Sequence, residues 1–207
     1  MTVREIAAFW TVAVLLIMAP GPDWAFTISA GLRGRSVLPA VAGLVIGYAA
    51  VTVIVAAGVG ALVAGSAAVL TGLTVAGGAY LLWQGALTVA RPAAPTVVAA
   101  QSGSGWGVVA RGIGVSGLNP KGLLMFLALL PQFTDRAGRW PIAGQIGVLG
   151  LVFVVTCGLF YLGLGSFARL VLHARPGVAR AVSRVSGVAM IVIGVGLVVE
   201  RLIAGWR

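Results

Sequence analysis

The chain has 207 residues, of which 60% are apolar and 9% are charged. An average soluble domain carries about 25% charged residues, so this composition excludes an ordinary water-soluble globule, and its high hydrophobicity excludes disorder. The net charge of +10 comes from bases that lie between apolar runs, which favours a membrane topology over nucleic-acid binding. We therefore expect an all-α, polytopic membrane protein that contacts lipid and binds no nucleic acid.

Uncharged runs mark six expected membrane spans in chain order. The first begins at residue 6 and continues past Asp23, and residues 36–90 are uncharged for long enough to form two helices with a turn at 64–66. Residues 91–107 are rich in Pro, Ser and Gly, so we expect a linker there. The remaining runs, separated by a short polar loop and by a basic loop at 169–184, are 108–134, 141–167 and 185–199.

The six spans divide into two halves within a single transmembrane domain, residues 1–207. Residues 1–90 form the first three-helix repeat and residues 108–207 the second, joined by the 91–107 linker. Because each half has an odd number of spans, the two repeats are inverted relative to each other. Arginines are more numerous on the side of the basic loop, which places that side in the cytoplasm. We expect a multi-pass protein of the cytoplasmic (inner) membrane, with the first span retained rather than cleaved as a signal.

Each half contains a helix-breaking motif in its first span. Pro20, Gly21 and Pro22 precede Asp23, and Asn119-Pro120 precedes Lys121 about half a chain later. Proline breaks a helix, and the carbonyl groups that it frees are tolerated at membrane depth only inside the protein or beside a cavity. Matched breaks near the midplane of two inverted halves are typical of a transporter's binding site. The first and fourth helices are therefore expected to be broken at this site.

The residue types at the breaks suit a substrate with two opposite charges. Asn119 and Pro120 have the sequence of an N-cap and first position of a new half-helix, and Pro22 and Asp23 begin another. The positive ends of these half-helices and Lys121 suit a carboxylate, whereas Asp23 suits an ammonium group or a proton. A zwitterion such as an amino acid matches this set. The alternative is a purely structural role, in which the prolines only kink the helices and the two charges neutralise each other.

Three further residues, Trp24, Gly43 and Gly47, have two interpretations each. Trp24 follows Asp23 and either shapes the pocket or packs against a neighbouring helix. Gly43 and Gly47 are four positions apart, a spacing that brings helices close together. Their contact lies either inside the bundle or between the two copies of a homodimer.

Other functional classes find little support in the sequence. One Cys, one His and four acids do not supply a metal centre. The G-x-G-x-x-G pattern at 112–117 opens an expected membrane helix and follows no strand, so we expect no dinucleotide cofactor, and none of another kind. The sequence contains neither H-E-x-x-H nor G-x-S-x-G, which argues against an intramembrane enzyme.

These motifs, taken together and in order, resemble a known family. The first-span Pro-Gly-Pro with its following glycines, Ala79-Tyr80-Leu81, Asn119-Pro120-Lys121 and Pro131-Gln132-Phe133 are similar to the signatures of the lysine exporter and homoserine/threonine exporter family. The resemblance covers about residues 6–205, with Gly122 where the family often has Ala. It implies a six-helix inner-membrane secondary transporter that exports amino acids, driven by the proton gradient, and it does not fix which amino acid. The alternatives are a non-transporting scaffold or accessory subunit, and a passive channel.

Overall fold

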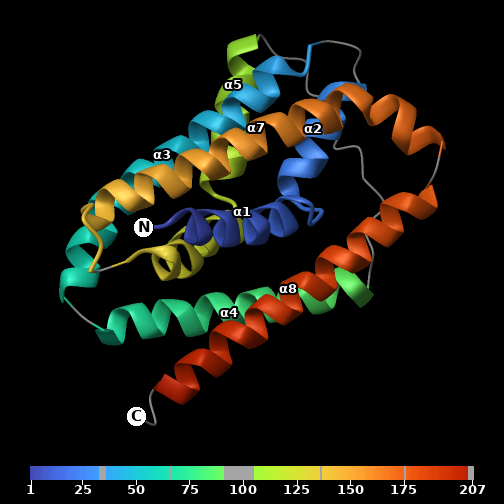
Figure 1. The fold of residues 1–207 in the computed structure, drawn as a ribbon. Coiled ribbons are helices and arrows are strands. Elements are labelled where there is room, and N and C mark those ends of the chain that lie inside the picture. Colours follow the sequence, from blue (N-terminus) through green and yellow to red (C-terminus); the bar gives the residue numbers. More distant parts are fainter. Residues whose placement is uncertain (33–35, 66, 91–104, 136, 175, 205–207) are drawn as a thin grey trace.

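The computed structural model describes residues 1–32, 36–65, 67–90, 105–135, 137–174 and 176–204. All regular elements in these residues are helical, as predicted (Figure 1). The elements are α1 (Val3–Ile17), α2 (Pro22–Leu32), α3 (Leu38–Gly65), α4 (Ala67–Ala90), α5 (Gly105–Gly117), α6 (Pro120–Leu124), the π-helix η1 (Met125–Leu129), the 3₁₀-helix η2 (Leu130–Phe133), α7 (Ile142–Ala174) and α8 (Pro176–Ala204).

Two of these helices are by themselves long and apolar enough to cross a membrane. They contain the stretches Leu38–Gly58 of α3 and Ile142–Ala168 of α7. The number rises to 4 among the described residues when each bent helix pair is counted as one span. The third and sixth expected spans correspond to α4 and α8, and α8 contributes a shorter apolar stretch, Gly187–Val199. That these two helices also cross the membrane stays a prediction.

Both predicted helix breaks are present. Helices α1 and α2 meet at 65° across residues 18–21, and the pair on either side of residues 118–120 meets at 56°. Pro22 opens α2 with Asp23 in its first turn, and Asn119 caps α6 with Pro120 at its start, as the sequence predicts. The second broken span continues through the π-helix η1, a wider turn that is frequent at functional sites.

The helices form two groups with the broken segments between them. Helix α3 packs against α5 and α7, and α4 packs along α8 (Figure 1). Helix α1 and the α6–η1–η2 segment lie between these groups, where η1 contacts α4 and α1 contacts α7. The two breaks are therefore in the interior of the molecule, where their free backbone groups find partners in the protein.

Glycines allow the closest helix approaches. A Cβ placed on Gly43 would lie 2.4 Å from the main-chain oxygen of Val109 on α5, so no larger residue fits there without moving a backbone. Helices α4 and α8 approach each other closely at two glycines, because a Cβ on Gly85 would lie 2.7 Å from the main-chain oxygen of Gly187. Small residues at such contacts are the usual means of packing helices in membranes, where lipid gives no hydrophobic driving force between them.

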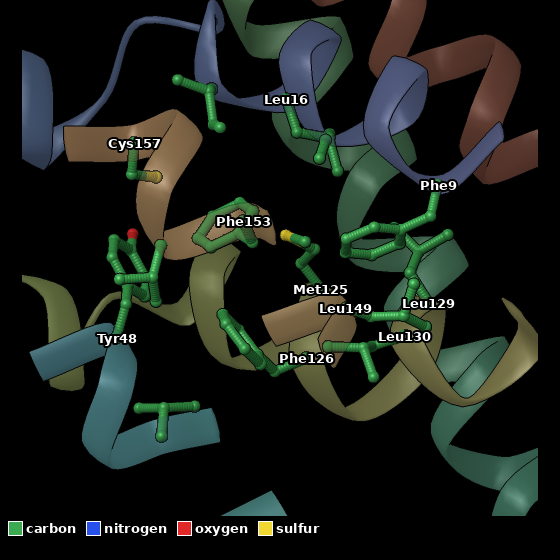
Figure 2. Packing of buried hydrophobic residues seen from close by; sticks show 14 of the residues in the cluster. Phe9, Leu16, Tyr48, Met125, Phe126, Leu129, Leu130, Leu149, Phe153 and Cys157 are labelled. Carbon is green, nitrogen blue, oxygen red and sulfur yellow. The ribbon is translucent and has the colours of Figure 1, made fainter. Parts of the chain in front are cut away.

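The buried core surrounds the second break. Phe126 of η1 packs edge to face on Phe153 of α7, with ring centroids 5.2 Å apart, and both contact the ring of Tyr48 on α3 (Figure 2). On the outside the molecule exposes large apolar side chains, among them Ile54 of α3 and Leu159 of α7. A surface of this kind suits lipid rather than water.

Two expected segments differ in the structure. Residues 105–107, expected in the linker, form the start of α5, because Gly-Trp-Gly lacks the proline that would stop a helix; residues 91–104 lie outside the described part. The expected basic loop is helical on both sides of residue 175, since α7 runs to Ala174 and α8 starts at Pro176. Arginine is a good helix former and proline is well tolerated at the first helical position, so charge alone did not mark a loop.

Candidate functional site

The two breaks meet at one small pocket. Its lining comes from α1, α2, α3, the α6–η1 segment and α7, and consists of Leu16, Ile17, Asp23, Tyr48, Lys121, Gly122, Met125, Phe153 and Tyr161. The pocket therefore brings together the two charged residues that the sequence singles out, which are about half a chain apart.

Asp23 is buried, and its two carboxylate oxygens have different surroundings. Oδ2 accepts hydrogen bonds from the hydroxyl of Tyr48 at 2.5 Å, from Nδ2 of Asn119 at 3.2 Å and from the hydroxyl of Tyr161 at 3.3 Å. Oδ1 is also buried but has no hydrogen-bond partner within the described part of the chain. One oxygen is thus held in place by three donors, while the other remains an acceptor without a donor.

Asn119 connects the second break to the first. Its Oδ1 caps α6 by accepting from the main-chain N of Lys121 at 3.1 Å. Its Nδ2 donates to Asp23 at 3.2 Å and to the hydroxyl of Tyr48 at 3.3 Å. The side chain therefore fixes both the start of the half-helix and the orientation of the carboxylate.

Lys121 binds the free carbonyl end of α1. Its Nζ donates to the main-chain oxygens of Leu16 at 3.1 Å and Ala19 at 2.9 Å, two carbonyl groups at the break. The oxygen of Leu16 also accepts from the main-chain N of Ala19 at 3.1 Å. Gly21 lies beside Lys121, since a Cβ there would be 3.5 Å from Nζ. Among the ion pairs of the described residues, none joins Lys121 to Asp23, so the two charges line the same pocket without a direct ion pair.

Trp24 binds the same helix end. Its indole Nε1 donates to the main-chain oxygen of Ile17 at 2.8 Å, and its ring lies 5.6 Å from that of Phe160 on α7. This contact favours the packing interpretation of Trp24, which is not among the pocket-lining residues. Pro20 lies in the break itself, between Ile17, the last residue of α1, and Pro22.

Three further pocket residues hold Asp23 or make room for its partners. Tyr48 and Tyr161 are isolated polar groups in apolar runs, which the sequence marks as able to hydrogen-bond across helices or face a cavity, but only the helix rotation shows that both face Asp23. Gly122 is required by Tyr48, because a Cβ there would lie 2.6 Å from Cε1 of the tyrosine ring. The sequence signal for Gly122 was that a glycine stands where the family motif often has Ala.

Gly43 and Gly47 lie away from the pocket. Both face α5 of the same chain, and a Cβ on Gly47 would lie 2.9 Å from the main-chain oxygen of Ile113. The described residues also contain no group of three or more His, Cys, Asp or Glu that could hold a metal ion.

Comparisons with known proteins agree with these features. The model of the LysE type translocator family matches residues 14–201. An uncharacterized membrane protein of Vibrio cholerae is 34% identical over 173 residues, which cover 81% of this chain and 82% of the relative. A leucine efflux protein of Klebsiella pneumoniae is 27% identical over 188 residues, which cover 86% of this chain and 87% of the relative. No solved structure matches the chain significantly.

The family match includes both breaks and every residue that lines the pocket. Together with the apolar helices and the lipid-suited surface, it makes this chain a multi-pass membrane transport protein of the inner membrane. The chain belongs to the LysE type translocator family.

Proposed function

We propose that this protein is a secondary transporter that exports amino acids across the cytoplasmic membrane in exchange for protons. The observation that carries the proposal is the buried pocket at two helix breaks, which Asp23 and Lys121 both line and in which one oxygen of Asp23 has no hydrogen-bond partner among the described residues. The family and the leucine efflux relative support amino acids as the class of substrate.

The substrate's two charged groups have matching partners in the pocket. The α-ammonium binds Asp23 Oδ1, the acceptor that no protein group uses in the described residues. The carboxylate binds Lys121, which donates two of its three N–H groups to Leu16 and Ala19 and has a third to offer. Asn119 holds the Asp23 carboxylate in position.

Coupling follows from competition for Asp23. A carboxylate buried at membrane depth needs a compensating positive charge or a proton. When the substrate leaves to the outside, a proton takes the place of its ammonium group on Oδ1. The loaded carrier thus moves substrate outward and the protonated carrier returns, so the inward proton gradient drives export.

Alternating access requires the two breaks to move apart and together. The pocket leaves room for little more than a water molecule, so the substrate enters a state in which the breaks are further separated. We propose that residues 1–90 and 108–207 are the two inverted three-helix repeats that move relative to each other, with the site between them.

The deciding experiment is flux into liposomes that contain the purified protein. We expect uptake of some members of a labelled amino-acid panel to depend on an imposed pH gradient, and to stop when an ionophore collapses the gradient. Flux without any response to the gradient would indicate a channel. Folded, inserted protein without flux of any amino acid would overturn the proposal in favour of a scaffold.

A further inference from the structure

We infer that the pocket selects amino acids with a neutral, apolar side chain and rejects those with a cationic one. The inference depends on the proposed function, because it assumes that the backbone charges of an amino acid occupy Asp23 and Lys121. It concerns what surrounds the rest of the substrate.

The pocket has no charge left for a charged side chain. Asp23 is the only acid and Lys121 the only base among the residues that line it in the described structure. A bound zwitterion uses both. Of the other acids whose side chains the structure describes, Glu5 belongs to the capping box at the start of α1 and Asp135 follows η2, and neither lines the pocket. The ammonium of a lysine side chain would therefore be buried without a counter-charge.

The remaining wall of the pocket is apolar. It is made by Leu16 and Ile17 at the end of α1, Met125 at the start of η1 and Phe153 of α7. Figure 2 shows Leu16, Met125 and Phe153 in the same part of the packed core. The hydroxyl groups of Tyr48 and Tyr161 donate to Asp23, so their polarity is directed at the same carboxylate and away from this wall.

The flexibility of Met125 also favours an apolar side chain. Methionine is flexible and fills irregular space, and it begins the one π-helical turn of the described chain, where the backbone is widened. An unbranched or branched aliphatic side chain of the substrate can replace the contacts of Met125, and its transfer out of water is favourable. A polar chain of the same length gains no hydrogen bond from Leu16, Ile17 or Phe153 in exchange for its hydration.

The test compares norleucine with lysine, which have the same carbon chain and differ by the terminal ammonium group. In one assay, proteoliposomes transport labelled norleucine while unlabelled lysine or unlabelled norleucine competes. In a second assay, the transport of labelled lysine is compared with that of labelled norleucine. We expect lysine to be weaker by on the order of 100-fold or more, as for an uncompensated buried charge. Transport of lysine at the level of norleucine would overturn the inference and leave the proposed function intact. Flux of neither, with other amino acids transported, would also overturn the inference alone, whereas folded protein without flux of any amino acid would overturn the proposed function as well.

A variant places the missing charge in the wall. Met125→Glu should admit lysine and lower norleucine transport, whereas the matched variant Met125→Gln, of similar size and without charge, should not admit lysine. Size-exclusion profiles would show whether each variant inserts and folds. A folded Met125→Glu protein that still rejects lysine would remove Met125 from the side-chain wall. If that variant does not fold, the wild-type ratio of lysine to norleucine still decides the inference.

Discussion

Asn119 Nδ2 lies 3.2 Å from Asp23 Oδ2, and this hydrogen bond joins two residues that are 96 positions apart. Lys121 makes a second connection in the same direction, because its Nζ donates to main-chain oxygens at the end of α1. Side chains of the second break thus contact both the carboxylate and the carbonyl groups of the first. A substrate that binds Oδ1 of Asp23 and the third N–H of Lys121 would connect the same two breaks, which links its binding to their relative position.

Asp23→Asn is expected to abolish transport. The amide keeps the shape of the side chain but removes the negative charge that the proposal assigns to ammonium and proton binding. Flux and its response to a pH gradient in proteoliposomes should both disappear, with unchanged membrane insertion. Asp135→Asn is the matched control, since this partly exposed carboxylate lies outside the pocket and should leave flux unchanged. Full activity of Asp23→Asn would remove Asp23 from the site.

Lys121→Met is expected to abolish transport and also to destabilise the protein. The aliphatic stem is replaced at similar length, but the oxygen of Ala19 loses its side-chain donor in a buried region, and that of Leu16 keeps only the main-chain N of Ala19. Leaving such groups unsatisfied costs about 1–3 kcal/mol. The melting temperature in detergent should therefore fall together with flux, whereas Arg139→Met, at an exposed position, should change neither. Normal flux with a lowered melting temperature would assign Lys121 a purely structural role.

The sequence predicted the helical class, both breaks and the cap of α6, because each depends on local chemistry. Proline removes a helical hydrogen bond and suits the first turn of a new helix, as at positions 22 and 120, and Asn119 is a strong N-cap residue. The charges at 23 and 121 were conspicuous because charge is rare at membrane depth.

The partners of these charges could not be predicted, because they depend on how the helices are rotated. A uniformly apolar helix such as α3 gives no periodic signal for which face is inside, so Tyr48 could not be assigned to Asp23. The carbonyl groups that bind Lys121 have no sequence signature at all. The length of α7 and α8 was underestimated because arginines within them were interpreted as a loop.

Gly122→Ala is expected to reduce transport because the added methyl group displaces the ring of Tyr48. The new methyl group would lie 2.6 Å from Cε1 and 3.0 Å from the hydroxyl oxygen of the tyrosine, so the ring must shift and its hydrogen bond to Asp23 must lengthen or break. Overpacking of this kind costs about 1–3 kcal/mol. Initial flux rates and melting temperature would be measured beside Gly114→Ala, a control position on α5 that is open to a methyl group. Equal effects of the two substitutions would contradict the role of Gly122 in placing Tyr48.

Gly43→Ala is expected to destabilise the single chain, because Gly43 brings α3 against α5. The added methyl group would lie 2.4 Å from the oxygen of Val109 and 2.8 Å from Cα of Gly112, and these backbone atoms move only if the helices separate. The expected loss is about 1–3 kcal/mol, read as a lower melting temperature in detergent.

Gly58→Ala on the same helix is the matched control, because a methyl group there meets nothing within 4 Å. It should keep or slightly raise the melting temperature, since alanine has the higher helix propensity. If Gly43 instead formed the contact between two copies, Gly43→Ala would change the molecular mass measured by light scattering while the monomer melted as before. A lowered melting temperature at unchanged mass is the result that the packing of α3 on α5 requires.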